Sequence, residues 1–155
     1  MRIRTLIMLA AAFLAGAAAG LTAAPAARQL AKQFLNEKGE EPPGYTHVVA
    51  SAPGKMIFLS GAGGAGADGK LPSDFLAQAR NTFERLHKRL ALAGADFKDV
   101  VKINYYITDL ANTSALREIR ARYLDMEHPP ASTLVQTGLA PGLLLEVELV
   151  AMVPQ

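Results

Sequence analysis

The amino-acid sequence predicts a single α+β domain whose elements follow the order β-β-α-β-α-β-β. Three stretches carry this prediction. Apolar residues recur at helical spacing after Pro72, and apolar and polar residues alternate over residues 100–108 and again over residues 144–153. The chain has 155 residues, which is enough for one domain and not for two.

The first 26 residues have the pattern of a secretory signal peptide. Arg2 and Arg4 precede an uncharged apolar run, and a small, alanine-rich stretch follows it. We expect cleavage after Ala26, or a little earlier near Ala24, and export of the domain to the periplasm or the medium. The alternative is an uncleaved membrane anchor, but the run is shorter than the roughly 20 residues of a spanning helix.

Removal of residues 1–26 leaves a domain without net charge. It takes away Arg2 and Arg4, so 16 basic residues become 14, against 14 acidic ones. A neutral domain lacks the basic surface of a nucleic-acid-binding protein, and we expect no such partner and no membrane contact after cleavage. The chain has no cysteine, which excludes disulfides, thiolate nucleophiles and zinc–thiolate sites.

The segment that follows the signal peptide begins with a predicted linker. Residues 27–43 are polar and end in two prolines, and a short helix over residues 30–35 is an alternative within them. The domain proper is expected over residues 44–154. Its first two strands are predicted at residues 45–51 and 55–60, joined as a hairpin by Ala52-Pro53-Gly54.

The first helix is predicted to follow a glycine- and alanine-rich loop at residues 61–71. Ser73 is its expected N-cap, and Gly94 is expected to end it. Its inward stripe is formed by Phe75, Ala79, Phe83, Leu86 and Leu90.

The second half of the domain is predicted to contain a strand, a helix and two further strands. Residues 100–108 form a predicted strand, with Val101, Ile103, Tyr105 and Ile107 on its core face. A helix is predicted over residues 113–124 and turns Leu116, Ile119 and Tyr123 inward. The last two strands are predicted at residues 132–137 and 144–153, and the latter buries Leu145, Val147, Leu149, Ala151 and Val153.

Two glycine motifs resemble nucleotide-binding loops. Gly61-Ala-Gly63-Gly-Ala-Gly66 fits the dinucleotide pattern, but that chemistry needs a helix that begins inside the motif, and Pro72 comes before any helix. Residues 64–70 read GxxxxGK, yet Leu71 stands where a magnesium-binding Ser or Thr is required. We therefore interpret both as loop and expect no cofactor.

Several polar side chains remain as candidates for a site. His47, His87 and His128 lack the close spacing of metal ligands, so no metal is expected. Glu146 and Glu148 share one strand face, where they are either solvated or general acid–base groups. Arg117 and Arg120 are interpreted as a solvated helix face or, alternatively, as a pair that binds a carboxylate.

Several segments together resemble the Rid family of reactive-intermediate (enamine/imine) deaminases over about residues 42–153. The resemblance implies a chorismate-mutase-like fold, with two helices on one face of a mixed sheet, and a homotrimer that binds small molecules in clefts between subunits. The ordered segments are Gly44-Tyr45, Met56-Ile-Phe-Leu-Ser60-Gly61, Gln78, Gly94-Ala-Asp-Phe-Lys-Asp-Val-Val101, Ile107-Thr-Asp109-Leu, Pro130-Ala131 and Leu145-Glu146-Val-Glu148-Leu-Val-Ala151.

The resemblance also implies a set of site residues. Glu146 and Ser60 would be catalytic, and no cofactor or metal is implied. The family's carboxylate-binding Arg is replaced by Ser132, which indicates an atypical substrate because an Arg fork binds a carboxylate far better than a hydroxyl does. The implied substrate-binding residues are Tyr45, Gly61, Arg117, Arg120, Ser132 and Thr133.

Two functions from different classes follow. The first is a cofactor-independent hydrolase that converts small C=N intermediates to a carbonyl and ammonia. The second is a binding or interaction module on the same trimer without chemistry, since one fold serves many functions. Chorismate rearrangement rests on the fold analogy alone and ranks below both.

Overall fold

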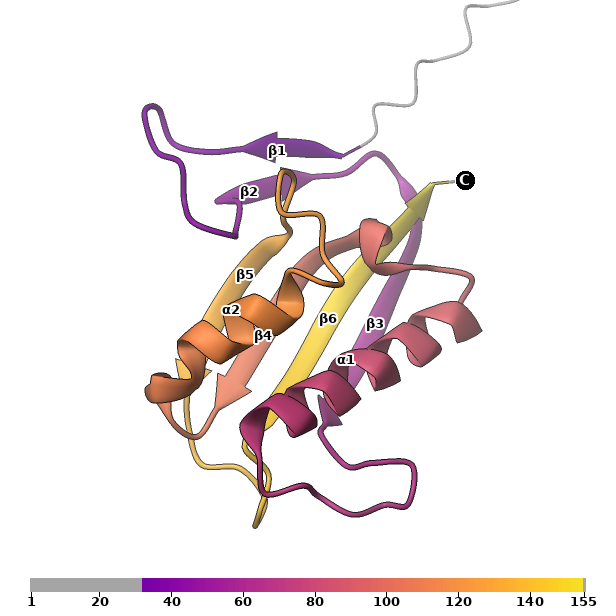
Figure 1. Cartoon of the computed structure of the whole chain (residues 1–155). Helices are drawn as coiled ribbons and strands as arrows, with labels where there is room; N and C mark the ends of the chain where they lie inside the picture. The colour runs from indigo at the N-terminus through magenta and orange to yellow at the C-terminus, as the bar shows by residue number, and fades with distance from the viewer. Residues whose placement is uncertain (1–31, 155) are drawn as a thin grey trace, which may run out of the picture.

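A four-stranded mixed sheet, covered on one face by two helices, forms the core of the domain (Figure 1). The computed structural model describes residues 32–154, and the predicted signal peptide lies outside them. The elements are β3 (Gly54–Gly63), α1 (Phe75–Leu92), β4 (Val100–Ile107), α2 (Thr113–Arg120), β5 (Ala131–Gln136) and β6 (Leu145–Pro154). Strand order is β3-β6-β4-β5, with β4 and β5 parallel and the other two pairs antiparallel. The α+β fold is as predicted.

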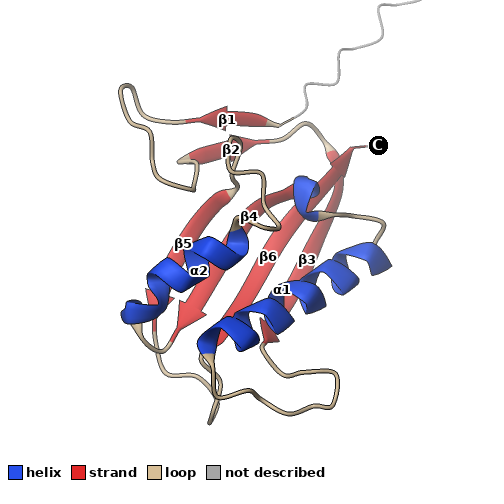
Figure 2. Ribbon diagram, viewed as in Figure 1, coloured by secondary structure: helices blue, strands red, loops and turns tan. Residues whose placement is uncertain are grey.

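A second, two-stranded sheet lies at the start of the described chain (Figure 2). β1 (Gln33–Leu35) pairs antiparallel with β2 (Val48–Ala50). The predicted hairpin between residues 45–51 and 55–60 is therefore wrong, as is the alternative of a helix at residues 33–35. Pro53 indicates a turn but does not determine which strands pair on either side of it. β3 pairs along its length with β6, which is distant in sequence, and Phe58 lies opposite Val150.

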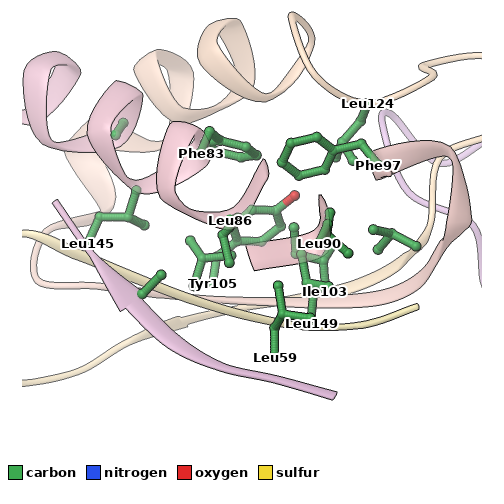
Figure 3. Packing of buried hydrophobic residues seen from close by; sticks show 14 of the residues in the cluster. Leu59, Phe83, Leu86, Leu90, Phe97, Ile103, Tyr105, Leu124, Leu145 and Leu149 are labelled. Carbon is green, nitrogen blue, oxygen red and sulfur yellow. The ribbon is translucent and has the colours of Figure 1, made fainter. Parts of the chain in front are cut away.

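Helix α1 supplies the largest part of the buried core. Phe75, Ala79, Phe83, Leu86 and Leu90 are all buried, so the predicted stripe is confirmed. They pack on residues of β3, β4 and β6 and on the aromatic ring of the 3₁₀ turn Phe97–Asp99 (Figure 3). No helix in residues 32–154 is long and apolar enough to cross a bilayer.

The ends of both helices differ in detail from the prediction. Asp74, not Ser73, caps α1: its extended backbone places the carboxylate 2.8 Å from the Ala77 N–H. Gly94 takes the left-handed conformation (φ 72°) directly after the helix, as expected of its terminator. A 3₁₀ turn, Leu110–Asn112, precedes α2, and α2 ends at Arg120, before the predicted residue 124.

The alternation of β4 separates a covered face from an open face of the sheet. Ile103, Tyr105 and Ile107 are buried under the helices, while Asn104 and Tyr106 are partly exposed on the other side. Register slips between Val100 and Lys102, so Val100 is buried and Val101, predicted to be a core residue, is only half-buried. This division decides which site residues can meet within one chain.

Gln78 connects the start of α1 to the turn before β6. This buried side chain donates to the carbonyls of Pro72 (2.6 Å) and Gly142 (2.8 Å) and accepts from the Leu144 N–H (2.9 Å). Gly64 lies so close to Gln78 that a Cβ there would overlap its backbone. The glycine loop is thus packed against α1 through this residue.

We expect Gln78→Leu to lower the free energy of unfolding by about 2 kcal/mol or more, because it removes three hydrogen bonds between a buried side chain and the main chain. Chemical denaturation measures this loss. Gln136→Leu, at an exposed position, is the control and should change it by less than about 0.5 kcal/mol. Equal effects of the two substitutions would contradict the proposed role of Gln78.

Candidate functional site

The predicted site residues fall into two groups on opposite faces of the sheet. Ser132 on β5 is paired with Ile103, whose side chain is buried under the helices. Glu146 on β6 is paired with Tyr106, three positions further along β4. Directly paired residues share a face, and an odd number of steps along a strand changes the face. One chain therefore does not bring Ser132 and Glu146 together.

The open-face group is built on an irregularity in β3. The register of β3 against β6 shifts between Leu59 and Ala62, which leaves Ser60 and Gly61 out of regular pairing. A Cβ on Gly61 would overlap the Glu146 carboxylate. Glycine at this position is therefore what allows the carboxylate to lie against the strand.

Arg89 of α1 holds the same irregularity from the other side. Its Nη1 donates to the carbonyls of Ser60 and Gly61, each at 3.1 Å. In a trans peptide the N–H points opposite to the C=O, so the N–H groups of Gly61 and Ala62 point away from Arg89. Sequence analysis missed this role, because helical spacing shows which side chains are outward but not which carbonyls they reach.

Glu148 is held as an anion next to Glu146 on β6. Its Oε1 accepts from Asn104 Nδ2 (3.0 Å) and from the Tyr106 hydroxyl (2.8 Å). Both bonds lower the pKa of the Glu148 carboxyl, and the bond to Glu148 raises the pKa of the Tyr106 phenol. Within residues 32–154, no hydrogen bond reaches the Glu146 side chain, so its carboxylate is free to hold a water or a ligand.

We expect Tyr106→Phe to raise the pKa of Glu148, because the carboxylate loses one of its two donors. A carboxyl with a depressed pKa stabilises the fold above its unfolded pKa and loses that contribution as pH falls through the folded pKa. In the variant, the free energy of unfolding should therefore also depend less on pH in the acid range. NMR titration measures the pKa, and Tyr123→Phe, which removes a hydroxyl bonded to Glu84, should leave it unchanged.

The second group lines a cavity of about 310 Å³ between α2 and the covered face of β4 and β5. Four predicted residues meet there, while Thr133 does not: it lies on the open face and accepts from Lys102 Nζ (2.8 Å). The lining residues are Pro43, Tyr45, Tyr105, Thr113, Leu116, Arg117, Arg120, Ser132 and Leu134.

Arg120 is a buried cation, contrary to the interpretation of a solvated helix face. It is 8% exposed because it shares the inward stripe of α2 with Leu116 and Ile119. Its Nη2 donates to the Pro43 carbonyl at 3.4 Å, while its buried Nε has no partner. In the described part of the chain no carboxylate lies within 4.0 Å of it.

Tyr105 adds a second unpartnered polar group beside Arg120. Its ring centre is 5.9 Å from the guanidinium carbon, and its buried hydroxyl has no hydrogen-bond partner. Burial raises the pKa of Tyr105 to about 12, against smaller opposing effects of the Arg120 charge and of the nearby Arg120 N–H groups, which can donate to the hydroxyl but cannot accept its proton. The hydroxyl is therefore neutral at physiological pH and can donate.

Within residues 32–154 the glycine motifs do not run into a helix, and the three histidines lie apart from one another. β3 continues through Gly63, and no helix begins between Gly63 and Phe75, so the interpretation of the glycine motifs as loop is confirmed from Gly64 onward. His47, His87 and His128 contact Glu40, Asp96 and Asp125 respectively, at separate places. Residues 32–154 contain no group of three potential metal ligands.

The chain is similar in sequence to a known protein family and to several of its members. The family model described as Endoribonuclease L-PSP matches residues 39–153. Protein DfrA of Myxococcus xanthus is 31% identical over 70% of this chain and 84% of its own. 3-Aminoacrylate deaminase RutC of Acinetobacter baylyi is 30% identical over 79% of this chain and 98% of its own.

A solved structure has the same fold. The crystal structure of YyfB from Yersinia pestis, a member of the conserved Rid protein family, superimposes with a TM-score of 0.68 at 30% identity. The match covers 79% of this chain and 98% of that one.

Proposed function

This chain belongs to the Rid family, whose model is described as Endoribonuclease L-PSP, and on that premise we propose that it hydrolyses small reactive C=N compounds to a carbonyl and ammonia. The observation that carries the proposal is the Glu146 carboxylate, free of hydrogen bonds within residues 32–154 and set against the backbone of Gly61. One relative is named a deaminase, which supports the same class of reaction.

In the proposed reaction Glu146 acts as a general base and then as a general acid. It accepts one proton from a water whose oxygen attacks the C=N carbon, and passes it to the nitrogen to give a carbinolamine. It then moves the remaining proton from the new hydroxyl group to the nitrogen, as the C–N bond breaks and the C=O bond forms. Water and imine thus give a carbonyl compound and ammonia. The Ser60 hydroxyl and the Gly61 N–H would orient the nitrogen or the oxygen that develops charge.

We further propose a homotrimer in which each cleft joins Glu146 of one copy to the cavity of the next. Two observations support it. The two groups of site residues lie on opposite faces of the sheet, so a ligand that touches both must bridge copies. The open face also exposes Met56 (53%) and Phe58 (73%), apolar side chains that a neighbouring copy would cover.

An oxidase-coupled assay tests the proposed function. An amino-acid oxidase generates a 2-imino acid, and semicarbazide traps the portion that has not hydrolysed. The protein should reduce the trapped imine and speed ammonia release. Ser132 in place of the family's Arg favours the alternative, a non-catalytic binding module, and an unchanged yield of trapped imine would support that alternative.

We also propose that the protein acts after export. The charged start, apolar run and small residues of the first 26 positions support this. N-terminal sequencing of the protein isolated from cells should find Ala27 first, and a retained Met1 would contradict it.

A further inference from the structure

We propose that the cavity under α2 binds a dicarboxylate, with Arg120 holding one carboxylate and Arg117 the other. The inference rests on the proposed function and narrows its substrate to 2-imino acids that carry a second carboxylate on a chain of four or five carbons. It uses residues of α2 and β4 rather than the position of Ser132.

Arg120 requires an anion that the described chain does not supply. A buried guanidinium is costly unless it is paired and hydrogen-bonded. Here it has one long bond to Pro43, and its buried Nε donates to nothing. A planar carboxylate that enters the cavity would accept from Arg120 and remove that cost.

Tyr105 indicates where the same carboxylate would lie. Its hydroxyl is buried and without a partner, and its ring lies beside the Arg120 guanidinium. A buried hydroxyl left without a bond costs stability, and a carboxylate oxygen is the acceptor that both groups lack. Two unsatisfied donors at one wall of one cavity thus point to one ligand group.

Arg117 supplies the second positive charge. It lines the same cavity, one helical turn after Thr113, and no acid lies within 4.0 Å of it in residues 32–154. None of the lining residues is acidic. Arg117 is exposed, as expected of a solvated helix face, so it offers its charge at the solvent side of the cavity, while Arg120 is buried. A dicarboxylate can pair with both guanidinium groups, whereas a monocarboxylate can pair with one.

The size of the cavity limits the ligand. A volume of about 310 Å³ is at the lower end of the range for small-molecule sites. Tyr45, Leu116 and Leu134 contribute apolar side chains to the lining, which suits the short carbon chain of a small dicarboxylate.

The test compares two unreactive four-carbon acids, succinate and butyrate, by calorimetry on the intact protein. We expect succinate to bind at least about tenfold more tightly. Arg117→Gln should remove this preference, and Arg120→Gln should abolish binding of both acids. Arg122→Gln is the matched control in the turn just after α2, because Arg122 is exposed and paired with Glu118; it should change neither affinity.

Equal affinities, or no measurable binding of either acid, would overturn the proposal. If Arg120→Gln fails to fold, two other variants test the proposal. Arg117→Gln should remove the preference for succinate, and Tyr105→Phe should weaken succinate binding several-fold. The same preference should appear in catalysis. The protein should hydrolyse the imine that an oxidase makes from aspartate faster than the imine made from alanine. Tight succinate binding without any deamination would refute the proposed function and leave the subsite standing.

Discussion

Glu146→Gln is expected to lower the rate of imine hydrolysis by about 10²- to 10⁴-fold, the usual contribution of a general acid–base group. The amide keeps the shape of the side chain but cannot accept the proton of the attacking water. Because Glu146 makes no side-chain hydrogen bond within residues 32–154, the substitution should cost the fold little. The oxidase-coupled assay measures the rate and thermal unfolding measures the stability.

Glu148→Gln is the matched control for that experiment. Glu148 lies two residues away on the same face, but its oxygen already accepts from Asn104 and Tyr106. A glutamine oxygen can accept the same two bonds, so the deaminase rate should fall by less than about tenfold. If the two substitutions reduced the rate equally, Glu146 would have no special role.

Gly61→Ala should reduce the same rate by about 10²-fold or more, since a catalytic group displaced by about 1 Å can lose that much. The new methyl group would overlap the Glu146 carboxylate, which must turn away from the strand. Stability should change little, because only atoms of the Glu146 side chain lie in the way of the methyl group and the main chain need not shift.

Gly138→Ala is the control for the Gly61→Ala experiment, because it shows whether replacing a loop glycine by alanine lowers the rate. A methyl group added at Gly138 would meet no atom within 4 Å, and the residue does not have a positive φ, so the change should affect neither rate nor stability. Normal activity of Gly61→Ala would show that the position of Glu146 against Gly61 is not needed for the reaction.

Local periodicity predicted both helices and the strands of the four-stranded sheet, but it missed β1, which lies in the predicted linker, and not all strand partners were predicted. The stripe of α1 and the alternation of β4 and β6 lie within single segments, so the sequence reveals them directly. The pairing of β1 with β2 and of β3 with β6 depends on contacts between distant segments. A turn signal such as Pro53 therefore predicted a hairpin that the longer pairing of β3 excludes.

The same limit applies to the site. Period-two spacing predicted that Glu146 and Glu148 share a face, and the structure agrees. The separation of Ser132 from Glu146 depends on the registers β4–β5 and β4–β6, which no single strand encodes. Burial of Arg120 was detectable in part, because it stands four positions after Leu116, but its charge favoured a solvated position.

The central claim, a site shared between copies, is tested most directly by mixing two inactive variants. Glu146→Gln removes the base, and Ser132→Trp fills the cavity. If each site joins Glu146 of one copy to the cavity of the next, mixed trimers contain intact sites, and co-expression in equal amounts should restore about a quarter of the wild-type activity. If mixed trimers form and stay as inactive as either variant alone, both groups act within one chain and the shared site is wrong.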